Sequence, residues 1–507
     1  MDIGSYLAQN ARKTPEKLAI ECEGRSYTYK QFNEEVNKLA RGLLSLGISK
    51  GERIALMMKN SDQFVFAFFA GAKIGAVIVP VNFRLTSSEV HYILEQSGTV
   101  LVICDDEFED TITSARKGTN AAHVITTGIP KVVGHHSLNH VLSDHVTDPQ
   151  IEVSDDDDLE ILYTSGTTGR PKGALFDHKR VFNVGLTMMI SMGINQEERI
   201  LHIAPLFHSA QLNLFLVSGV VLGATHIIHR DFHPVTTLQA IQQHKITHFF
   251  GVPAMYNFML QVPNASDYDL SSIKRCGYGA APMAPELVRK SMELFRTDQF
   301  YNLCGLTEAG PGGILLGPEG HKHHLGKGGK AAFLTEARVV DEEGKDIKPG
   351  AVGEFIIKGE SIMKGYYKMP EETAKTIKDG WLYTGDLATV DENGYITLVD
   401  RKKDMIISGG ENVYSIEVEE VLYEHPAVLE AAIIGLPDEV WGEAVCAVIV
   451  PKQNAVVDEQ ELKGFCRQKL AGYKVPRRIF IEEALPRNAS GKILKYQLRQ
   501  KLNEVKL

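Results

Sequence analysis

The first hundred residues alternate between two hydrophobic periods, and this alternation limits the fold more than any other feature of the sequence. Short apolar runs at residues 53–58, 76–80 and 100–104 are typical of buried strands. The segments between them, 62–74 and 87–96, carry a helical pattern. Strands that alternate with helices are joined by crossover connections, so they form largely parallel sheets with both faces covered. The sequence therefore predicts an α/β fold.

The pattern of predicted strands and helices changes twice farther along the chain. Residues 181–256 repeat the strand–helix alternation, whereas short strands separated by turns begin near Arg338. A second alternation of helices and strands follows Asp400 and indicates a compact α+β unit of about a hundred residues. A chain of 507 residues is also too long for one ordinary core. We therefore expect at least two domains, with a boundary near Asp400.

Composition limits the partners of the chain. A formal net charge of -10 argues against a nucleic-acid partner, which usually calls for a basic face. The six cysteines contain no C-x-x-C pair, so neither a disulfide framework nor a zinc site is expected. Residues 1–4 lack the pattern of a signal peptide, and the apolar stretch 64–80 falls short of a spanning helix. We expect a soluble, cytoplasmic protein; transient membrane association and a homodimer stay open.

A loop rich in glycine and hydroxyl residues is the strongest functional signal. It follows a short apolar strand and reads Thr164-Ser-Gly-Thr-Thr-Gly-Arg-Pro-Lys172-Gly173. Glycines let backbone amides approach an anion, hydroxyls add donors, and a lysine supplies positive charge. The common nucleotide loop is different, because here Pro171 precedes the lysine and a glycine follows it. The predicted phosphate-binding residues are Thr164, Ser165, Gly166, Thr167, Thr168, Gly169 and Lys172.

Further motifs follow this loop in a fixed order. They are Tyr301-Asn-Leu-Cys-Gly-Leu-Thr-Glu308, Tyr383-Thr-Gly-Asp386, Asp400-Arg-Lys-Lys-Asp404 and Pro486-Arg-Asn-Ala-Ser-Gly-Lys492. Together with the loop they resemble the signatures of the adenylate-forming superfamily, which includes acyl-CoA synthetases, luciferases and the adenylation domains of peptide synthetases. The resemblance covers essentially the whole chain. It implies a large N-terminal domain of layered, largely parallel sheets with flanking helices and a β-rich subdomain, followed by a small mobile α+β domain.

The resemblance also assigns roles around the nucleotide. It implies that Gly305 and Thr307 contact ATP and that Glu308 lies near Mg²⁺. It implies that Asp386 holds the ribose hydroxyls, which suits a carboxylate because it accepts two hydrogen bonds. Arg401 is expected at a ribose or phosphate oxygen. The family usually has an aromatic residue where this chain has Cys304, so stacking on adenine is expected to be weaker, or to come from Tyr301 or Tyr278.

The remaining implied residues serve the acid and coenzyme A. His208 resembles the family residue near the acyl carbon, and Lys492 the catalytic lysine that bridges the carboxylate and the α-phosphate. Gly279, Ala280 and Ala281 would line the acyl pocket, and Gly409 and Gly410 would let the pantetheine arm pass. The resemblance places a hinge at Asp400–Lys403. The expected domains are 1–399, the hinge 400–403 and the mobile domain 404–507, which carries Lys492.

We therefore expect an ATP-dependent acid–thiol ligase that forms an acyl-adenylate, releases pyrophosphate and passes the acyl group to CoA. The segments expected to line the acid pocket, 208–215, 249–256 and 279–283, are apolar and contain no arginine or lysine. A medium- or long-chain fatty acid is the expected substrate, since an unpaired buried charge is costly. Two alternatives stay open: an aryl acid such as a hydroxycinnamate, and the loading of a carrier protein. A non-catalytic nucleotide-binding protein is disfavoured, because all of the implied nucleotide residues are present.

Overall fold

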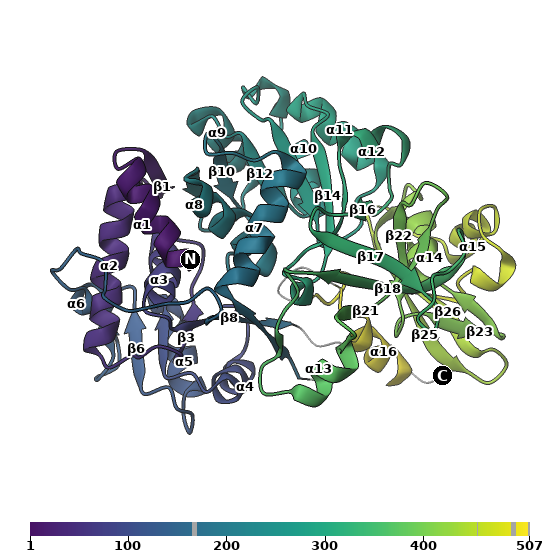
Figure 1. Ribbon diagram of the computed structural model, residues 1–507. Helices are drawn as coiled ribbons and strands as arrows, with labels where there is room; N and C mark the ends of the chain where they lie inside the picture. Colours follow the sequence, from purple (N-terminus) through teal and green to yellow (C-terminus); the bar gives the residue numbers. More distant parts are fainter. Residues whose placement is uncertain (165–169, 454, 488–492, 505–507) are drawn as a thin grey trace. The chain divides into compact units, whose positions relative to one another are not determined.

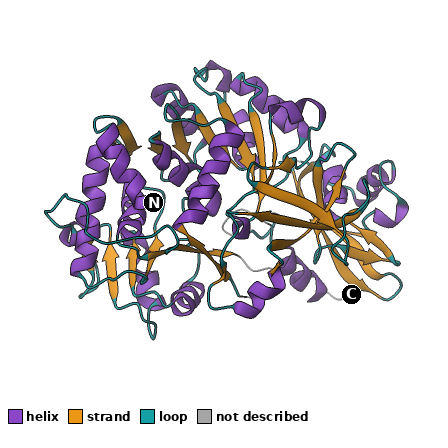
Figure 2. Cartoon of the chain, in the orientation of Figure 1, coloured by secondary structure: helices purple, strands orange, loops and turns teal. Residues whose placement is uncertain are grey.

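The computed structural model describes residues 1–164, 170–453, 455–487 and 493–504. The chain, drawn in Figure 1 with colours that follow the sequence, forms two compact units. The first unit consists of Met1–Ala337 and Ile357–Leu382, and the second of Arg338–Ile356 and Tyr383–Leu507. Each unit contains both helices and strands (Figure 2). Among the described residues, every helix is too short or too polar to span a bilayer.

The two compact units do not coincide with the expected domains. Segments 338–356 and 383–399 belong to the same compact unit as the C-terminal residues, although they precede the expected hinge. The two units show which segments pack together, and packing alone does not locate a hinge. The domain limits 1–399, 400–403 and 404–507 therefore stay a prediction.

An eight-stranded sheet forms one half of the first unit. Its strand order is β19-β9-β8-β4-β3-β5-β6-β7, and its central pairs are parallel. Strands β3, β4 and β5 lie where the short apolar runs predicted them, and β4 and β5 are buried along their whole length. The strands are β3 (Arg53–Met57), β4 (Val77–Pro80), β5 (Leu101–Cys104), β6 (His123–Thr126), β7 (His136–Ser137), β8 (Asp158–Thr164), β9 (Lys172–Asp177) and β19 (Gly365–Tyr366).

Helices connect and cover these strands. Helix α3 (Asp62–Lys73) is apolar almost all round, and every residue except Gln63 is buried, as expected for an internal helix. Helix α2 (Tyr29–Ser45) begins at a capping box in which Thr28 and Gln31 bond reciprocally. The other helices of this half are α1 (Ile3–Lys13), α4 (Ser87–Ser97), α5 (Glu109–Ala115) and α6 (Leu138–Val141), with the 3₁₀ turn η1 (Asp106–Phe108).

A nine-stranded sheet forms the other half of the first unit. Its order is β16-β15-β14-β13-β12-β10-β11-β1-β2, and the run from β14 to β1 is parallel. In a parallel run all carboxyl ends reach the same edge, where ligands of open α/β sheets bind. The strands are β1 (Leu18–Cys22), β2 (Arg25–Thr28), β10 (Arg199–His202), β11 (Thr225–Ile228), β12 (His248–Gly251), β13 (Arg275–Gly279), β14 (Phe300–Gly305), β15 (Gly313–Leu316) and β16 (Lys330–Ala331).

The two faces of this sheet carry different clusters of buried side chains. Because successive strand residues point to opposite faces, Phe249 joins one cluster and Phe250 the other. The Phe249 face packs against α9 (Pro234–His244), α10 (Pro253–Leu260) and α11 (Pro285–Phe295). The Phe250 face packs against α7 (His178–Met192) and a π-helix, η2 (Ala210–Val217). Also present are α8 (Ser218–Leu222), α12 (Pro318–His323), α13 (Pro370–Thr376), η3 (Ala265–Asp267) and η4 (Thr307–Ala309).

Two smaller sheets complete the chain. The first has the strand order β17-β18-β21-β20, with β22 beside β21. The limits between the two units fall inside strands β17, β18 and β21. The order β24-β23-β26-β25, with β27 beside β26, describes the sheet of the C-terminal part. The strands are β17 (Thr335–Val340), β18 (Val352–Gly359), β20 (Ile377–Lys378), β21 (Trp381–Val390), β22 (Ile396–Arg401), β23 (Ile406–Ser408), β24 (Glu411–Val413), β25 (Val428–Asp438), β26 (Gly442–Pro451) and β27 (Arg478–Ile481). The helices are α14 (Ser415–Tyr423), α15 (Glu459–Arg467) and α16 (Lys495–Glu504), with η5 (Gly472–Lys474).

Candidate active site

The predicted phosphate loop joins two paired strands. Strands β8 and β9 form an antiparallel hairpin in which Thr164 lies opposite Lys172. The Thr164 hydroxyl donates a hydrogen bond to the Lys172 carbonyl at 3.4 Å. Gly173 allows the close approach of the strands, because a Cβ there would lie 2.5 Å from the Ile161 side chain. The hairpin therefore fixes both ends of the loop. The predicted residues Ser165, Gly166, Thr167, Thr168 and Gly169 lie outside the described residues.

The loop lysine already contacts a carboxylate and an aromatic ring. Lys172 Nζ lies 2.8 Å from Glu372 Oε2 and 4.8 Å from the centre of the Tyr366 ring. The hydrogen bond from Lys172, followed by that from Lys375, lowers the pKa of Glu372 to about 2. A cation over an aromatic face is attracted by the ring quadrupole. Lys172 is therefore held at the base of the loop by Glu372 and Tyr366, neither of which the sequence had indicated.

Glu308 lies in the turn η4 that follows β14. The Tyr366 hydroxyl donates a 2.9 Å hydrogen bond to Glu308 Oε1, and Met363 N donates to the Glu308 carbonyl at 2.9 Å. In the same turn, the Thr307 hydroxyl lies 3.2 Å from the hydroxyl of Ser209, the residue after His208. The structure thus brings Glu308, Thr307, the His208 segment and, through Tyr366, the phosphate-loop lysine together.

The carboxylate of Glu308 suits a Mg²⁺ ion carried by a nucleotide. Mg²⁺ in phosphoryl-transfer sites usually takes one or two protein carboxylates, with substrate phosphates and water as its other ligands. The described residues contain no cluster of three potential metal ligands, so a dedicated protein cage is not formed by this part of the chain. With Oε1 held by Tyr366, the Glu308 carboxylate is oriented and would contribute one ligand, directly or through water. The metal would neutralise charge on the phosphate oxygens.

His208 occupies a loop that is anchored from the other sheet. The Asn60 amide donates to the Ala204 carbonyl at 2.9 Å, and Leu206 N donates to Asn60 Oδ1 at 2.7 Å. Ala210 N donates to His208 Nδ1 at 3.3 Å, so Nδ1 is the acceptor and the proton of the neutral ring lies on Nε2. Burial lowers the pKa of His208. A neutral ring with an Nε2 donor is suited to a carboxylate or carbonyl oxygen of the acid.

The predicted acyl-pocket residues lie at the carboxyl edge of the parallel strands. A Cβ on Gly279 would lie 2.2 Å from the Leu303 carbonyl oxygen, so β13 and β14 approach closely only because this residue is glycine. Ala280 follows with φ +66, a left-handed conformation that is unusual for alanine and typical of functional sites. Ala280 and Ala281 are exposed. Cys304 and Gly305, at the end of β14, lie next to this edge.

One expected stacking partner for adenine is excluded by burial. Tyr278 is 1% exposed, and its hydroxyl donates to His321 Nε2 at 2.9 Å. His321 Nδ1 in turn donates to the Gly317 carbonyl at 2.8 Å, which fixes the tautomer. The expectation that Tyr278 stacks on adenine is wrong, because its ring is closed inside the α11-side cluster. Tyr301 is also buried, at 7% exposure, on the opposite face.

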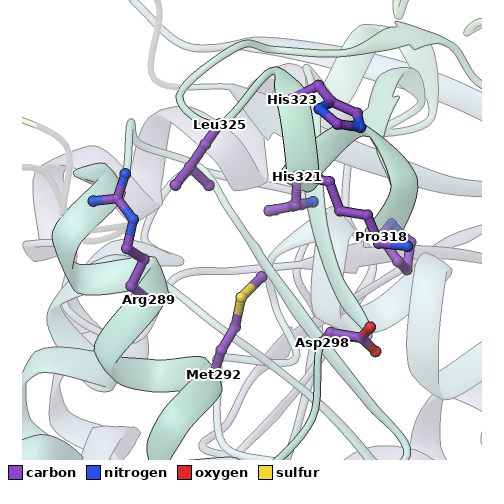
Figure 3. Close-up of a pocket in the computed structure, with 8 residues that line it drawn as sticks. Arg289, Met292, Asp298, Pro318, His321, His323 and Leu325 are labelled. Atoms are coloured by element: carbon purple, nitrogen blue, oxygen red, sulfur yellow. The ribbon is translucent and has the colours of Figure 1, made fainter.

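A pocket of about 390 Å³ lies beside this hydrogen-bond chain (Figure 3). Arg289 and Met292 of α11 line one side, and His321 and His323 of α12 line the other. None of the predicted site residues lines it. It is therefore a cleft between two surface helices and not the predicted acyl or nucleotide site.

The residues expected to line the acid pocket divide between the two faces of the nine-stranded sheet. Leu214, Phe215 and Phe250 belong to the cluster on the α7 and η2 face. Phe249 and Tyr256 belong to the opposite cluster, as does Met283. The expectation that all of them share one pocket is wrong, because alternate strand residues point away from each other. Only the first group lies on the same face as the π-helix that follows His208.

In the second unit, Asp386, expected at the ribose, pairs with Arg401, expected at a ribose or phosphate oxygen. Asp386 of β21 lies directly opposite Arg401 of β22, and Arg401 Nε lies 2.6 Å from Asp386 Oδ1. Asp400, expected at the hinge, is buried and accepts hydrogen bonds from Ser415 N at 2.5 Å and Ser415 Oγ at 2.9 Å. Burial lowers the pKa of Lys403. The strand that carries Arg401 is thus tied to the start of α14.

The other predicted residues of this unit lie in tight turns. Gly409 and Gly410 form the two-residue turn between β23 and β24, with φ values of +62 and +84. A Cβ on Gly409 would lie 2.9 Å from the Trp441 ring, and Gly410 has nothing within 4 Å of its position. The turn alone requires glycine, so CoA contact there stays a prediction. Lys492 lies outside the described residues, but the ends of its loop are joined by a bridge between Arg487 and Ile493.

Comparison with known proteins identifies the class. The model of the AMP-binding enzyme family matches residues 7–367, and that of the AMP-binding enzyme C-terminal domain matches residues 417–492. The fold and the matched regions define an adenylate-forming enzyme. The chain belongs to the AMP-binding enzyme family, within the group of acyl-CoA synthetases. The resemblance and the fold class expected from the sequence are thus confirmed.

Individual relatives are similar over nearly their whole length. The chain is 36% identical to a feruloyl-CoA synthase of Amycolatopsis sp, covering 98% of this chain and 99% of the relative. It is 38% identical to the long-chain-fatty-acid–CoA ligase FadD13 of Mycobacterium tuberculosis, covering 98% of both chains. A crystal structure of the anthranilate CoA ligase AuaEII with anthranoyl-AMP superposes with a TM-score of 0.90 at 28% identity, covering 99% of this chain and 97% of that one.

The chain is therefore an AMP-forming acid–CoA ligase, with ATP and CoA as substrates and Mg²⁺ as the usual partner of ATP. The acid carboxylate attacks the α-phosphate and pyrophosphate leaves, so positioned cations must offset charge on the phosphate oxygens. Tyr366 and Glu372 contact predicted site residues, and Asn60 anchors the segment before His208; the sequence reasoning missed all three. Glu372 pairs with a residue 200 positions away, and no spacing pattern marks such a pair.

Proposed function

We propose that the acid activated by this enzyme carries a large apolar group, and that a medium- or long-chain fatty acid is the preferred substrate. The observation that carries this proposal is the face of the nine-stranded sheet next to His208. All eight residues of the π-helix η2 are buried, and none of them is charged. An apolar chain buried there would gain about 0.8 kcal/mol per methylene group until the space is filled.

The charged residues of the neighbouring strands lie at the wrong end to receive a second carboxylate. Arg199 and Arg275 occupy the first positions of β10 and β13, whereas the acid is expected at the carboxyl edge of these strands. Arg275 is also paired with Glu198 at 2.8 Å. A dicarboxylic acid would therefore bury a charge without a partner, which costs several kcal/mol.

Histidines on the same face do not supply that charge either. His202, His226 and His248 are fully buried, and burial lowers the pKa of each. His202 Nε2 lies 2.9 Å from His226 Nδ1, which is a hydrogen bond between neutral rings. Neutral imidazoles do not compensate a carboxylate. This supports an acid whose only charge is the reacting carboxylate.

One observation favours an aryl acid as the second candidate. The rings of Phe215 and Phe250 stack at 5.4 Å with an interplanar angle of 23°. Gly277 presents no side chain beneath them, where a Cβ would make ordinary contacts of 3.4 Å with Phe250 and 3.6 Å with Phe215. A flat ring such as that of a hydroxycinnamate would extend this stack. The similarity to a feruloyl-CoA synthase points the same way.

The test is kcat/KM for pyrophosphate release with acetate, octanoate, palmitate, 4-coumarate and succinylbenzoate. The proposal predicts the highest value for octanoate or palmitate. A maximum with 4-coumarate would promote the aryl-acid candidate, and a maximum with acetate or succinylbenzoate would contradict the apolar site. Each acid is measured with and without CoA. Adenylate formation without any acyl-CoA product would indicate loading of a carrier protein.

A further inference from the structure

A buried carboxyl group and a buried amide face each other between the two sheets of the first unit. Glu160 of β8 and Asn213 of η2 are both 0% exposed, and Asn213 Nδ2 donates to Glu160 Oε1 at 2.6 Å. The second oxygen of each group, Glu160 Oε2 and Asn213 Oδ1, has no hydrogen-bond partner within the described residues. Two acceptor oxygens without a donor are costly at full burial.

A single proton on Glu160 would give both of these oxygens a hydrogen-bond partner. A carboxylic acid is a donor at one oxygen and an acceptor at the other, and a primary amide has the complementary donor and acceptor. We propose that Glu160 is held as the neutral acid in a two-bond pair with Asn213, and that this pair sets the position of the π-helix η2, which the proposed function places at the acid, relative to strand β8. The second bond runs from Glu160 Oε2–H to Asn213 Oδ1. Both residues are positioning residues that act through the elements they join.

The pair connects the two elements that carry opposite ends of the reaction. Strand β8 belongs to the eight-stranded sheet and runs directly into the phosphate loop, whereas η2 packs on the nine-stranded sheet and begins two residues after His208. Asn213 is itself held, because the Ser218 hydroxyl donates to its carbonyl at 2.5 Å. A π-helix spaces its residues differently from an α-helix and often marks a functional position. Asn60, which anchors the loop before His208, is another link between the two sheets.

The surroundings of Glu160 favour the protonated form. Burial raises the pKa of Glu160 to about 7, and the Asn213 bond opposes this rise. Among the described residues, no charged neighbour contributes to the pKa of Glu160. The titratable side chains on β8, on its neighbour β9, and on α7 and β10, which pack against η2, are Asp158, Tyr163, Lys172, Asp177, His178, Lys179, Arg180, Arg199 and His202. Asp177 is compensated by its ion pair with Arg180.

The pair should therefore open as the pH rises. The folded-state pKa lies above the usual value of 4.5, so the contribution of Glu160 to stability is complete below about pH 4.5 and is lost as the pH rises through about 7. Once ionised, Glu160 keeps the bond from Nδ2 but loses its own donor, so Glu160 Oε2 and Asn213 Oδ1 are again without a donor among the described residues. An unpaired charge between the sheets then favours their separation.

The direct test is infrared difference spectroscopy of the full-length protein, wild type minus Glu160→Gln, at pH 6 and pH 9. Wild type should show one protonated-carboxyl C=O band at pH 6 that is absent from the variant and lost at pH 9. Asn213→Leu should retain the band and move it to higher frequency, because the carbonyl loses its donor. Absence of the band at pH 6 in wild type would overturn the proposal. These spectra need no substrate, so their outcome is independent of which acid the enzyme uses.

The functional test compares pH profiles. Glutamine offers the same donor and acceptor as the protonated acid at every pH, so Glu160→Gln should lose less acid-dependent pyrophosphate release between pH 6 and pH 9 than wild type. We expect the fold-loss of pyrophosphate release between pH 6 and pH 9 to be about tenfold or more greater in wild type than in Glu160→Gln. Glu160→Leu should release pyrophosphate more slowly than wild type at all pH values. Superimposable wild-type and Glu160→Gln profiles would contradict the positioning role. If Glu160→Leu does not fold, Asn213→Leu takes its place.

Discussion

The hydroxyl of Tyr366 donates a 2.9 Å hydrogen bond to Oε1 of Glu308. The face of the same ring lies 4.8 Å from Nζ of Lys172, at the base of the phosphate loop. One tyrosine therefore orients the carboxylate expected at the metal and the cation expected at the phosphates. The sequence places these three residues more than fifty positions apart, and the fold brings them together in one unit.

Replacing Tyr366 with phenylalanine separates these two functions. The ring over Lys172 remains, whereas Glu308 loses its hydrogen bond. A hydrogen bond to a charged group contributes about 1.5–3 kcal/mol, so we expect the rate of adenylate formation at limiting Mg²⁺ to fall about tenfold or more. Excess Mg²⁺ should restore part of the rate. The measurement is the initial rate against Mg²⁺ concentration at fixed ATP. An unchanged Mg²⁺ dependence would show that Tyr366 does not orient Glu308.

The ion pair between Lys172 and Glu372 gives a second prediction. ATP phosphates must compete with the Glu372 carboxylate for the lysine, so Glu372→Gln should tighten ATP binding about two- to fivefold, as for loss of an exposed pair. Glu371→Gln, one residue earlier, removes the same charge and serves as the matched control. Equilibrium titration with ATP compares the two. Weaker ATP binding by Glu372→Gln, or equal tightening by both variants, would contradict the competition.

Cys304 gives a third prediction. With Tyr278 and Tyr301 buried, no exposed ring from these two residues is available to adenine. Cys304→Tyr should therefore tighten ATP binding several-fold, since stacking contributes about 0.5–1.5 kcal/mol. Cys304→Ser adds no ring and should leave the affinity unchanged. If Cys304→Tyr binds ATP more weakly than wild type, adenine does not lie against this strand end.

The two faces of strand β12 give a fourth prediction. Phe250 stacks on Phe215 on the face next to His208, whereas Phe249 packs against Tyr256 on the opposite face. Phe250→Leu should lower kcat/KM for 4-coumarate relative to octanoate by about threefold or more. Phe249→Leu makes the same chemical change and should lower the thermal midpoint without altering this ratio. Equal effects of both variants on the ratio would mean that the acid does not lie on the Phe250 face.

Much of the fold follows from local pattern. The apolar runs and helical spacing of the first hundred residues predicted β3, α3, β4, α4 and β5 within about two residues at each boundary, because strongly periodic segments depend little on their context. The division of Phe249 and Phe250 between two faces was also available, since strand residues alternate by rule. The prediction treated residues 249–256 as one segment that lines the acid pocket and ignored this alternation. For that reason it placed Phe249 and Phe250 in the same pocket.

The site was predictable only where a motif marks it. The hairpin around the phosphate loop, the turn that holds Glu308 and the Asp386–Arg401 pair lie in segments that the motifs indicated. Tyr366 and Glu372 were not predictable, because they reach Lys172 through tertiary packing and not through sequence spacing. The expectation that Tyr278 stacks on adenine failed for a related reason. A tyrosine near a strand end is exposed or buried according to which face of the sheet it occupies.

The most direct test of the central claim uses octanoate, ATP, Mg²⁺ and CoA with wild type and Lys492→Ala. Wild type should release AMP and pyrophosphate and form octanoyl-CoA in equal amounts. The variant should fail to form the adenylate yet still convert supplied octanoyl-adenylate into the thioester, because the lysine is required only where the carboxylate meets the α-phosphate. Release of ADP and phosphate by wild type, or equal loss of both half-reactions in Lys492→Ala, would contradict the account.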